Sequence, residues 1–499
     1  MGCLLKIDDA KPERMNLRVG SSGSGKRRRA GRRIAPRVWI GIAVDASDKS
    51  VHITGHNGNS MAPEKRSLID GSGNWTRRKF LGAVAGATAG ASLAPGLMLG
   101  AERARAGTPQ TVAILATKVA KYSHAQHFID RFLEGYGWHG KHHRPSLKLV
   151  SMYVDQFPEN DLARERSKRH NVPIYPSIAE ALTRGGSKLA VDGVLIIAEH
   201  GEYPQNEMGQ KLYPRYKFFK ETVDVFESSK RSVPVFNDKH LSTDWKESVE
   251  MVEDSRRLGF AFLAGSSLPV TWRIPSIELP LETELEESVA VCYGGVDSYD
   301  FHGFETAQCM SERRAGGEVG VKAVQALKGE ALWKRVESNP GTKELLFAAL
   351  ARSHSLKAPE GYTIWRPTVE WIREKAPEAT GFFVEHRDGF KTAMFLLNGL
   401  LRDFNYAGRV KGGEIASCQM QLPMPPSNTT LADFFNPLVN NIERTILSGR
   451  ATYPVERTLL TSGMTLAGVK SLHRDQSRVE TPEMKVAYRA GKESVFWRA

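Results

Sequence analysis

The sequence predicts an α/β protein: a Rossmann-like, doubly wound parallel sheet followed by an α+β domain with a mostly antiparallel sheet. Between residues 111 and 264, short apolar runs alternate with helical patterns, and this spacing is typical of βαβ units. Beyond residue 267, short polar turns such as 387–389 separate the apolar runs, as in sheets built from hairpins. We therefore expect one folded domain over 107–268 and a second over 269–499.

In the first domain, the run at 191–198 is almost continuously apolar, which is typical of a strand buried on both faces of a sheet. Strands are expected at 111–116, 147–155, 172–175, 191–198, 233–237 and 261–264. Helices are expected between them at 125–136, 161–170, 178–183, 213–228 and 243–258. Right-handed connections then place a ligand crevice at the carboxyl ends of the strands.

In the second domain, β-branched and aromatic runs indicate strands, and longer amphipathic patterns indicate helices. Strands are expected at 285–293, 380–386, 391–398 and 415–422, and helices at 317–327, 431–447 and 455–473. The stretch 135–145 in the first domain is rich in histidine and glycine, and we expect it to be a solvated loop.

The composition is that of an ordinary globular protein, with 41% hydrophobic and 25% charged residues among 499. These values exclude collagen, wholesale disorder and a multi-span membrane protein. The net charge of +13 is concentrated in residues 1–106, so the folded part is nearly neutral and no nucleic-acid partner is expected. Four cysteines are too few for a disulfide framework, and without CxxC spacing they give no support to a zinc finger; one disulfide among Cys292, Cys309 and Cys418 stays open.

Residues 74–106 resemble a twin-arginine export signal. Arg77 and Arg78 precede a mild apolar stretch, and the small-x-small pattern of a cleavage site follows at 104–106. The expected location is therefore periplasmic or extracytoplasmic, with the twin-arginine translocase as a partner during export. The alternative is a membrane anchor formed by an uncleaved signal. Residues 1–73 are interpreted as a disordered extension or an over-extended gene start.

Two motifs fall where the chain should approach the crevice. Asp238-Lys239-His240 follows the fifth expected strand, and a glycine pair at 294–295 leads toward His302 and Glu305. With the two-domain layout, these motifs resemble the Gfo/Idh/MocA oxidoreductases, which are NAD(P)-dependent enzymes acting on sugars, inositols and related polyols. The resemblance implies an enzyme that oxidises a CH-OH group.

The resemblance also implies roles for these residues. It places Lys239 on the substrate, where it lowers the barrier for removing the hydroxyl proton, with Asp238 as the neighbouring acid. It makes His302 the general base and Glu305 its partner, since the two are spaced i, i+3 on one helix face. Histidine suits this task because its ordinary pKa, near 6.5, lies close to neutrality.

For the cofactor, the resemblance implies NAD or NADP bound at a strand–GxGxxG–helix turn. This sequence has no glycine between residues 116 and 124, so side chains would crowd a close approach of the pyrophosphate. Thr117, Lys118, Ser123 and Asp155 are the candidate cofactor-binding residues. We expect the dinucleotide to bind weakly or in a displaced pose.

The candidate substrate-binding residues are His200, His240, Trp272 and Arg273, with a small carbohydrate or polyol as the expected ligand. The histidines and carboxylates expected in the crevice would also suit a divalent metal such as zinc or manganese. Two alternatives stay open: a non-redox lyase, hydrolase or isomerase on the same scaffold, and a non-catalytic sugar-binding protein. By analogy, the open face of the antiparallel sheet would make a homo-oligomer.

Overall fold

The computed structural model describes residues 40–44, 51–55, 109–363, 365–425, 431–492 and 495–496. The chain divides into two units, Met1–Ala101 and Glu102–Ala499. In the first unit, β1 (Ile40–Val44) pairs antiparallel with β2 (Val51–Gly55). The expected export signal at 74–106 lies outside the described residues. Within the described ranges, no helix is both long and apolar enough to cross a membrane.

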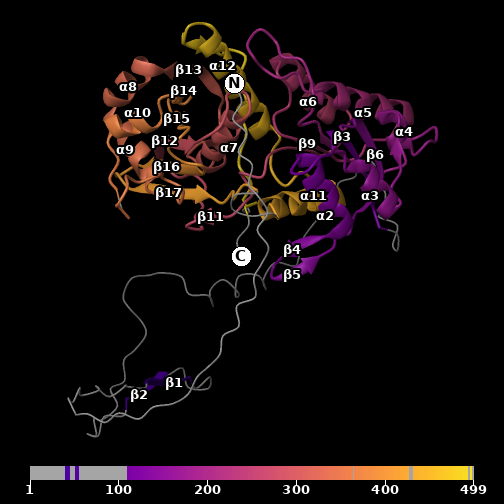
Figure 1. Ribbon diagram of the computed structural model, residues 1–499, viewed down its shortest axis with the longest axis horizontal. Coiled ribbons are helices and arrows are strands. Elements are labelled where there is room, and N and C mark those ends of the chain that lie inside the picture. The colour runs from indigo at the N-terminus through magenta and orange to yellow at the C-terminus, as the bar shows by residue number, and fades with distance from the viewer. Residues whose placement is uncertain are drawn as a thin grey trace, which may run out of the picture. The chain divides into compact units, whose positions relative to one another are not determined.

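The second unit begins with a six-stranded, fully parallel sheet (Figure 1). Its strands are β3 (Thr111–Lys118), β6 (Lys148–Gln156), β7 (Ile174–Tyr175), β8 (Gly193–Ile197), β9 (Val235–Asp238) and β10 (Phe262–Gly265). The order across the sheet is β10-β9-β8-β3-β6-β7. This is the strand order of the doubly wound dinucleotide-binding fold, so the predicted fold class is confirmed, with the topological switch point between β3 and β8.

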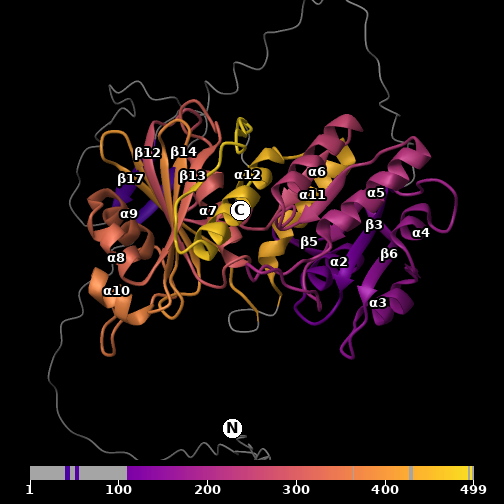
Figure 2. The ribbon, with the colours of Figure 1, turned by 90° about the horizontal axis from the view of Figure 1, so that it is seen from above.

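Helices cover both faces of this sheet (Figure 2). They are α2 (His124–Glu134), α3 (Ala163–His170), α4 (Ile178–Thr183), α5 (Arg215–Ser229) and α6 (Trp245–Arg257). Ser123, Ser177 and Asp244 begin three of these helices by accepting hydrogen bonds from backbone N–H groups of the first turn. The expected solvated loop at 135–145 instead forms a short hairpin of β4 (Tyr136–Trp138) and β5 (Lys141–His143).

The second sheet has eight strands in the order β11-β17-β16-β12-β15-β14-β13-β18. They are β11 (Arg273–Ile274), β12 (Leu285–Cys292), β13 (Val321–Lys328), β14 (Thr380–His386), β15 (Lys391–Leu396), β16 (Phe404–Val410), β17 (Ile415–Met420) and β18 (Val479–Glu480). Among these pairings only β12 with β15 is parallel. The predicted mostly antiparallel sheet is therefore confirmed.

The helix expected at 317–327 is wrong, because Val321–Lys328 forms β13, which lies next to the edge strand β18 of this sheet. Alanine, leucine, lysine and glutamine favour a helix in this segment, whereas its three valines favour a strand. Pairing with β14 on one side and β18 on the other buries the apolar side chains of β13 more fully than a surface helix would, and tertiary context then overrides the local preference.

Both faces of the second sheet are covered. One face packs on α8 (Gly329–Glu337), α9 (Pro340–Leu350) and α10 (Val369–Lys375), which share an apolar core with the sheet. The other face packs on α7 (Tyr299–Ser311) and α12 (Glu456–His473). The open sheet face on which we expected a homo-oligomer to form is thus occupied by helices of the same chain.

The end of the chain returns to the first sheet. A 3₁₀ turn, η1 (Asp433–Phe435), leads into α11 (Asn436–Ser448), and α11 packs against α2. A Cβ added at Gly193 of β8 would lie 2.7 Å from a side-chain carbon of Ile446, so the glycine permits this close approach. The predicted helices at 431–447 and 455–473 are confirmed, and the return brings Phe435 to the first turn of α2.

Candidate active site

The carboxyl ends of the parallel strands deliver most of the polar side chains singled out in the sequence. Lys239 follows β9 directly, in the left-handed conformation (φ 71°), and its backbone N–H donates to the carbonyl of Gly265 at the end of β10. His302 and Glu305 lie on α7, the helix that packs on the second sheet. Lys239 and His302 are 63 residues apart in the sequence, and the two motifs meet between the two sheets.

Lys239 and His302 are in direct contact. The Lys239 ammonium hydrogen-bonds Nε2 of the His302 imidazole, and both residues are only 6% exposed. Burial, followed by the positive charge of Lys239, lowers the pKa of His302 well below its ordinary value. His302 is therefore a neutral imidazole that accepts a hydrogen bond from the lysine through Nε2 and carries its proton on Nδ1.

Behind His302, Ser266 links the imidazole to Glu305. The Nδ1 atom of His302 lies 2.9 Å from the Ser266 hydroxyl, and this hydroxyl bonds the Glu305 carboxyl group. The Ser266 backbone N–H also donates to Glu305 at 2.9 Å. A Cβ at Gly265 would lie 2.6 Å from Glu305 Oε1, so only glycine, at φ 120°, fits here. We call Lys239, His302, Ser266 and Glu305 the central cluster.

The Glu305 carboxyl group should make stability depend on pH. Burial raises its pKa to about 7, so between about pH 4.5 and 7 the unfolded chain loses this proton while the folded protein keeps it, and stability falls as pH rises. Glu305→Gln removes this loss. The difference in unfolding free energy between the variant and wild type should therefore be about 2.5 kcal/mol more favourable to the variant at pH 8 than at pH 5, from about 1.4 kcal/mol per unit of pKa difference.

Urea unfolding at the two pH values measures this difference. The control is Glu330→Gln, which changes an exposed glutamate side chain (73% exposed). An equal effect of Glu305→Gln at both pH values would show that Glu305 is ionised throughout this range.

A second group of buried, hydrogen-bonded side chains lies beside the central cluster. Arg215 of α5 donates to Glu199 after β8 at 2.5 Å and to Nε2 of His240 at 3.0 Å. Burial favours the neutral form of Glu199, but the positive charges of Arg215 and Lys239 outweigh it and lower the pKa of this carboxyl group. Burial, then Arg215, lowers the pKa of His240 well below its ordinary value. His240 is thus bound to Arg215, a residue that the sequence analysis did not identify.

Asp238 pairs with a histidine that the sequence analysis also missed. Nδ1 of His124, the first residue of α2, lies 2.6 Å from Asp238 Oδ2, and the Asp238 side chain is fully buried. The ring of His200 lies 5.3 Å from that of His124. No spacing rule could have found this pair, because the two residues are 114 positions apart. The only local signal is a histidine at a turn that has no glycine.

The candidate cofactor-binding residues do not form a pyrophosphate site. Thr117 is fully buried and donates its hydroxyl to the Glu199 carbonyl at 2.8 Å. Ser123 is 3% exposed and uses its hydroxyl to cap α2. Phe435 covers the same turn, with its ring 5.1 Å from that of His124. A dinucleotide in the usual pose, with phosphates on the N-terminus of α2, does not fit these side chains.

The other two candidate cofactor-binding residues, Asp155 and Lys118, lie at the ends of neighbouring strands. Asp155, near the end of β6, accepts hydrogen bonds from the hydroxyls of Tyr153 at 2.8 Å and Tyr203 at 2.6 Å. Lys118 ends β3 and is half-buried. The ribose end of a nucleotide therefore has the Asp155 carboxylate beside it, and of the candidates at the phosphate end, Lys118 is the one that stays partly exposed.

Arg273 and Trp272 lie apart from the central cluster. Arg273 is 4% exposed, donates to the carbonyls of Ile277 and Pro269, and stacks over Phe496. Its hydrogen-bonding groups thus hold the link between the two sheets, and it is not placed to bind a sugar hydroxyl. Trp272 is half-buried and lines a different cleft.

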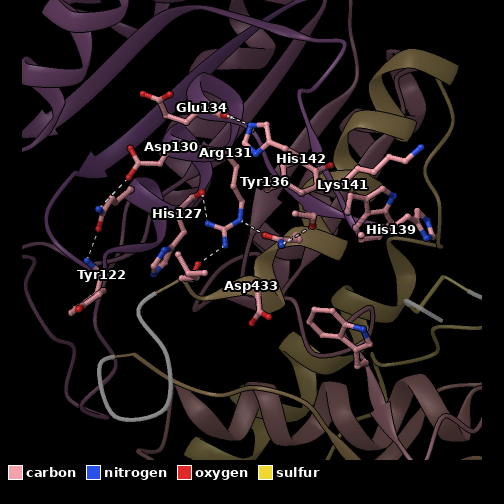
Figure 3. Close-up of a pocket in the computed structure, with 18 residues that line it drawn as sticks. Tyr122, His127, Asp130, Arg131, Glu134, Tyr136, His139, Lys141, His142 and Asp433 are labelled. Atoms are coloured by element: carbon pink, nitrogen blue, oxygen red, sulfur yellow. Dashed lines mark hydrogen bonds between the residues drawn. The ribbon is translucent and has the colours of Figure 1, made fainter.

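That cleft has a volume of about 690 Å³ and lies between α2, the β4–β5 hairpin and residues 431–436. Figure 3 shows His127, Arg131, Lys141 and Asp433 around it. Arg131 donates to the carbonyls of Leu431 and Ala432 and to Asn436, which fastens η1 and α11 to α2. Burial, then Arg131, lowers the pKa of His127 to about 3. His127 also stacks on Phe435 at 4.8 Å, so Phe435 contacts the cleft wall on one side and His124 on the other.

The possible divalent metal has no support here. Across the described ranges, no group of three or more histidine, cysteine, aspartate or glutamate side chains is arranged to hold a metal ion. The polar groups bind one another in pairs, such as Lys239 with His302 and His124 with Asp238.

No protein-family model and no curated protein matches this chain. Among solved structures, it is similar to GenD2 from gentamicin A biosynthesis in complex with NAD (TM-score 0.47, 10% identity, covering 77% of this chain and 99% of that one). It is also similar to myo-inositol dehydrogenase from Lactobacillus casei in complex with NAD(H) and myo-inositol (TM-score 0.44, 10% identity, 78% and 99%). A third is a probable dehydrogenase from Thermotoga maritima (TM-score 0.44, 11% identity, 74% and 98%). At this level, the similarities carry no argument about activity.

Proposed function

We propose that the chain is an oxidoreductase acting on a CH-OH group of a small carbohydrate or polyol, with Lys239 and His302 as the groups that handle the hydroxyl proton. One observation carries this proposal: a buried lysine contacts a neutral histidine at the carboxyl ends of a doubly wound sheet, the usual ligand position in this architecture. A second supports it, since the imidazole is backed by the Ser266–Glu305 pair.

The central cluster provides a complete path for a proton. A substrate hydroxyl beside Lys239 would accept a hydrogen bond from the ammonium group, which stabilises the developing alkoxide. When the substrate hydroxyl replaces the hydrogen bond between Lys239 and His302, Nε2 of His302 takes the hydroxyl proton, and its Nδ1 proton passes through the Ser266 hydroxyl to the Glu305 carboxylate. Because the Glu305 pKa is about 7, this group can accept and return a proton near neutral pH.

Oxidation of the carbon also requires a hydride acceptor, and in the proposed class this is NAD or NADP. The covered first turn of α2 does not fit a pyrophosphate in the usual pose, so we derive no hydride step. This mismatch favours a second candidate function: a non-redox lyase, isomerase or hydrolase that uses the same proton-handling groups without a nucleotide.

One experiment separates the two candidates. The purified chain is titrated with NAD and NADP by calorimetry and then incubated with a panel of sugars and polyols, with and without nucleotide, while products are followed by NMR. Nucleotide binding with nucleotide-dependent oxidation supports the oxidoreductase. Conversion of a substrate without nucleotide, and no binding at millimolar nucleotide, supports the non-redox enzyme. Binding of a sugar without any conversion would contradict both and indicate a sugar-binding protein.

Export through the twin-arginine route is also proposed, on the sequence of residues 74–106 alone. Arg77→Lys combined with Arg78→Lys should leave the protein in the cytoplasm, because the paired guanidinium groups are the recognised feature. Cell fractionation measures the distribution, with Lys79→Arg as the control because it leaves the pair intact. Normal accumulation of the double variant outside the cytoplasm would contradict this route.

A further inference from the structure

We infer that His124 and Asp238 form a second proton-transfer dyad, standing at the helix N-terminus where this architecture otherwise holds the pyrophosphate of a dinucleotide. The inference rests on the proposed function in one respect only, namely that the carboxyl ends of the parallel strands are the active site.

The geometry of the pair is that of an oriented general base. The Asp238 carboxylate accepts the hydrogen bond of His124 Nδ1 at 2.6 Å, which fixes the tautomer and leaves Nε2 with a free lone pair. No described residue hydrogen-bonds this Nε2 atom, and the His124 side chain is 17% exposed. A proton taken from a substrate O–H or C–H group onto Nε2 would create an imidazolium ion, which the buried carboxylate of Asp238 stabilises.

The surroundings of the pair contain buried polar atoms that still lack partners. Asp238 Oδ1 and His200 Nδ1 are both inaccessible and make no hydrogen bond within the described part of the chain. A buried polar atom without a partner costs about 1–3 kcal/mol. The pair therefore lies among groups whose hydrogen-bonding capacity is not used within the described part of the chain.

The dyad and the central cluster belong to one site. Asp238 and Lys239 are consecutive residues, so their backbones hold the two proton-handling pairs side by side. Lys239 and His124 both lie close enough to His302 and to Glu199 to act on them electrostatically. One pair can therefore remove a proton from the substrate while the other returns one, which is the arrangement that acid–base catalysis by two groups requires.

The same geometry explains why the phosphate end of the nucleotide site does not fit. The ring of His124 lies between Asp238 and Phe435, at the turn where the glycine fingerprint would let phosphates approach the backbone N–H groups. A histidine that belongs to a dyad cannot leave this place without losing its bond to Asp238. The dyad and a pyrophosphate are thus alternative occupants of the first turn of α2.

Histidine modification tests the dyad without needing the substrate. Diethyl pyrocarbonate acylates an imidazole nitrogen that has a free lone pair, and peptide mass spectrometry gives the rate at each histidine. We expect His124 to react. Asp238→Asn should slow this reaction about 10-fold, because it removes the carboxylate that orients the imidazole. The same substitution should leave the reaction rates of His139 and His142, on the hairpin, unchanged. The matched control is Asp155→Asn, which changes an acid near the end of β6, three strands away from β9 in the same sheet. Millimolar NAD or NADP should not protect His124.

Three results would overturn the inference: an unreactive His124, an Asp238→Asn rate equal to wild type, or protection of His124 by the nucleotide. Because Asp238 is buried, the Asp238→Asn protein could fail to fold. ¹⁵N-histidine NMR of the wild-type chain therefore gives a second test. At about pH 9, where free imidazole is neutral, His124 should carry its proton on Nδ1; a proton on Nε2 also overturns the dyad. None of these measurements depends on catalytic turnover or on Lys239, so a failure of the dyad can be distinguished from a failure of the proposed function.

Discussion

Lys239→Ala should lower kcat by roughly 100-fold or more, the scale of a lost proton-transfer group, while the protein remains folded. The ammonium group donates its hydrogen bond to His302 and stands beside the position proposed for the substrate hydroxyl. Alanine removes both this charge and the donor. It keeps the Cβ, so the left-handed backbone at this position (φ 71°) is no more strained than before.

Steady-state kinetics on the substrate identified in the sugar and polyol panel measures this effect, and thermal unfolding monitors the fold. Lys121→Ala is the matched control, since Lys121 is an exposed lysine on the loop before α2 and should turn over normally. A Lys239→Ala variant that keeps its kcat would contradict the catalytic assignment, and one that unfolds would show that this lysine has a structural role.

Glu312→Gln should lower the free energy of unfolding by about 3–5 kcal/mol, the usual cost of breaking a buried ion pair on one side. Glu312 follows α7 and accepts hydrogen bonds from Arg457 of α12 at 2.5 and 2.8 Å and from the Tyr488 hydroxyl at 2.9 Å. Arg457 and Glu312 are 3% and 2% exposed. The variant would leave the guanidinium charge buried without its counter-charge.

Urea unfolding measures the loss. The control is Glu385→Gln, which breaks the partly exposed pair of Glu385 with Arg478 and should cost no more than about 1 kcal/mol. Equal losses for the two variants would mean that solvent reaches Arg457. A much larger loss for Glu312→Gln would show that α7, α12 and the end of the chain depend on this one ion pair.

The sequence by itself determined the first sheet and much of the second. The strands of the first sheet are short apolar runs, and the helices beside it begin at polar residues such as Ser123 and Asp244. Both signals lie within a few residues of the strand or helix that they define. The rule for right-handed connections then leaves few possible strand orders. The same local spacing placed Lys239 at the end of a strand and His302 one turn before Glu305 on a helix.

Only the tertiary structure decided which side chains meet at these strand ends. His124 lies 114 residues from its partner Asp238, and Phe435 reaches α2 only because the chain returns to the first sheet through η1 and α11. The strand at Val321–Lys328 and the burial of Arg273 likewise depend on neighbours distant in sequence. Periodicity and spacing describe local geometry, whereas hydrogen-bond partners and burial depend on segments that only the folded chain brings together. For this reason a turn without glycine could be found in the sequence, but the histidine dyad that occupies it could not.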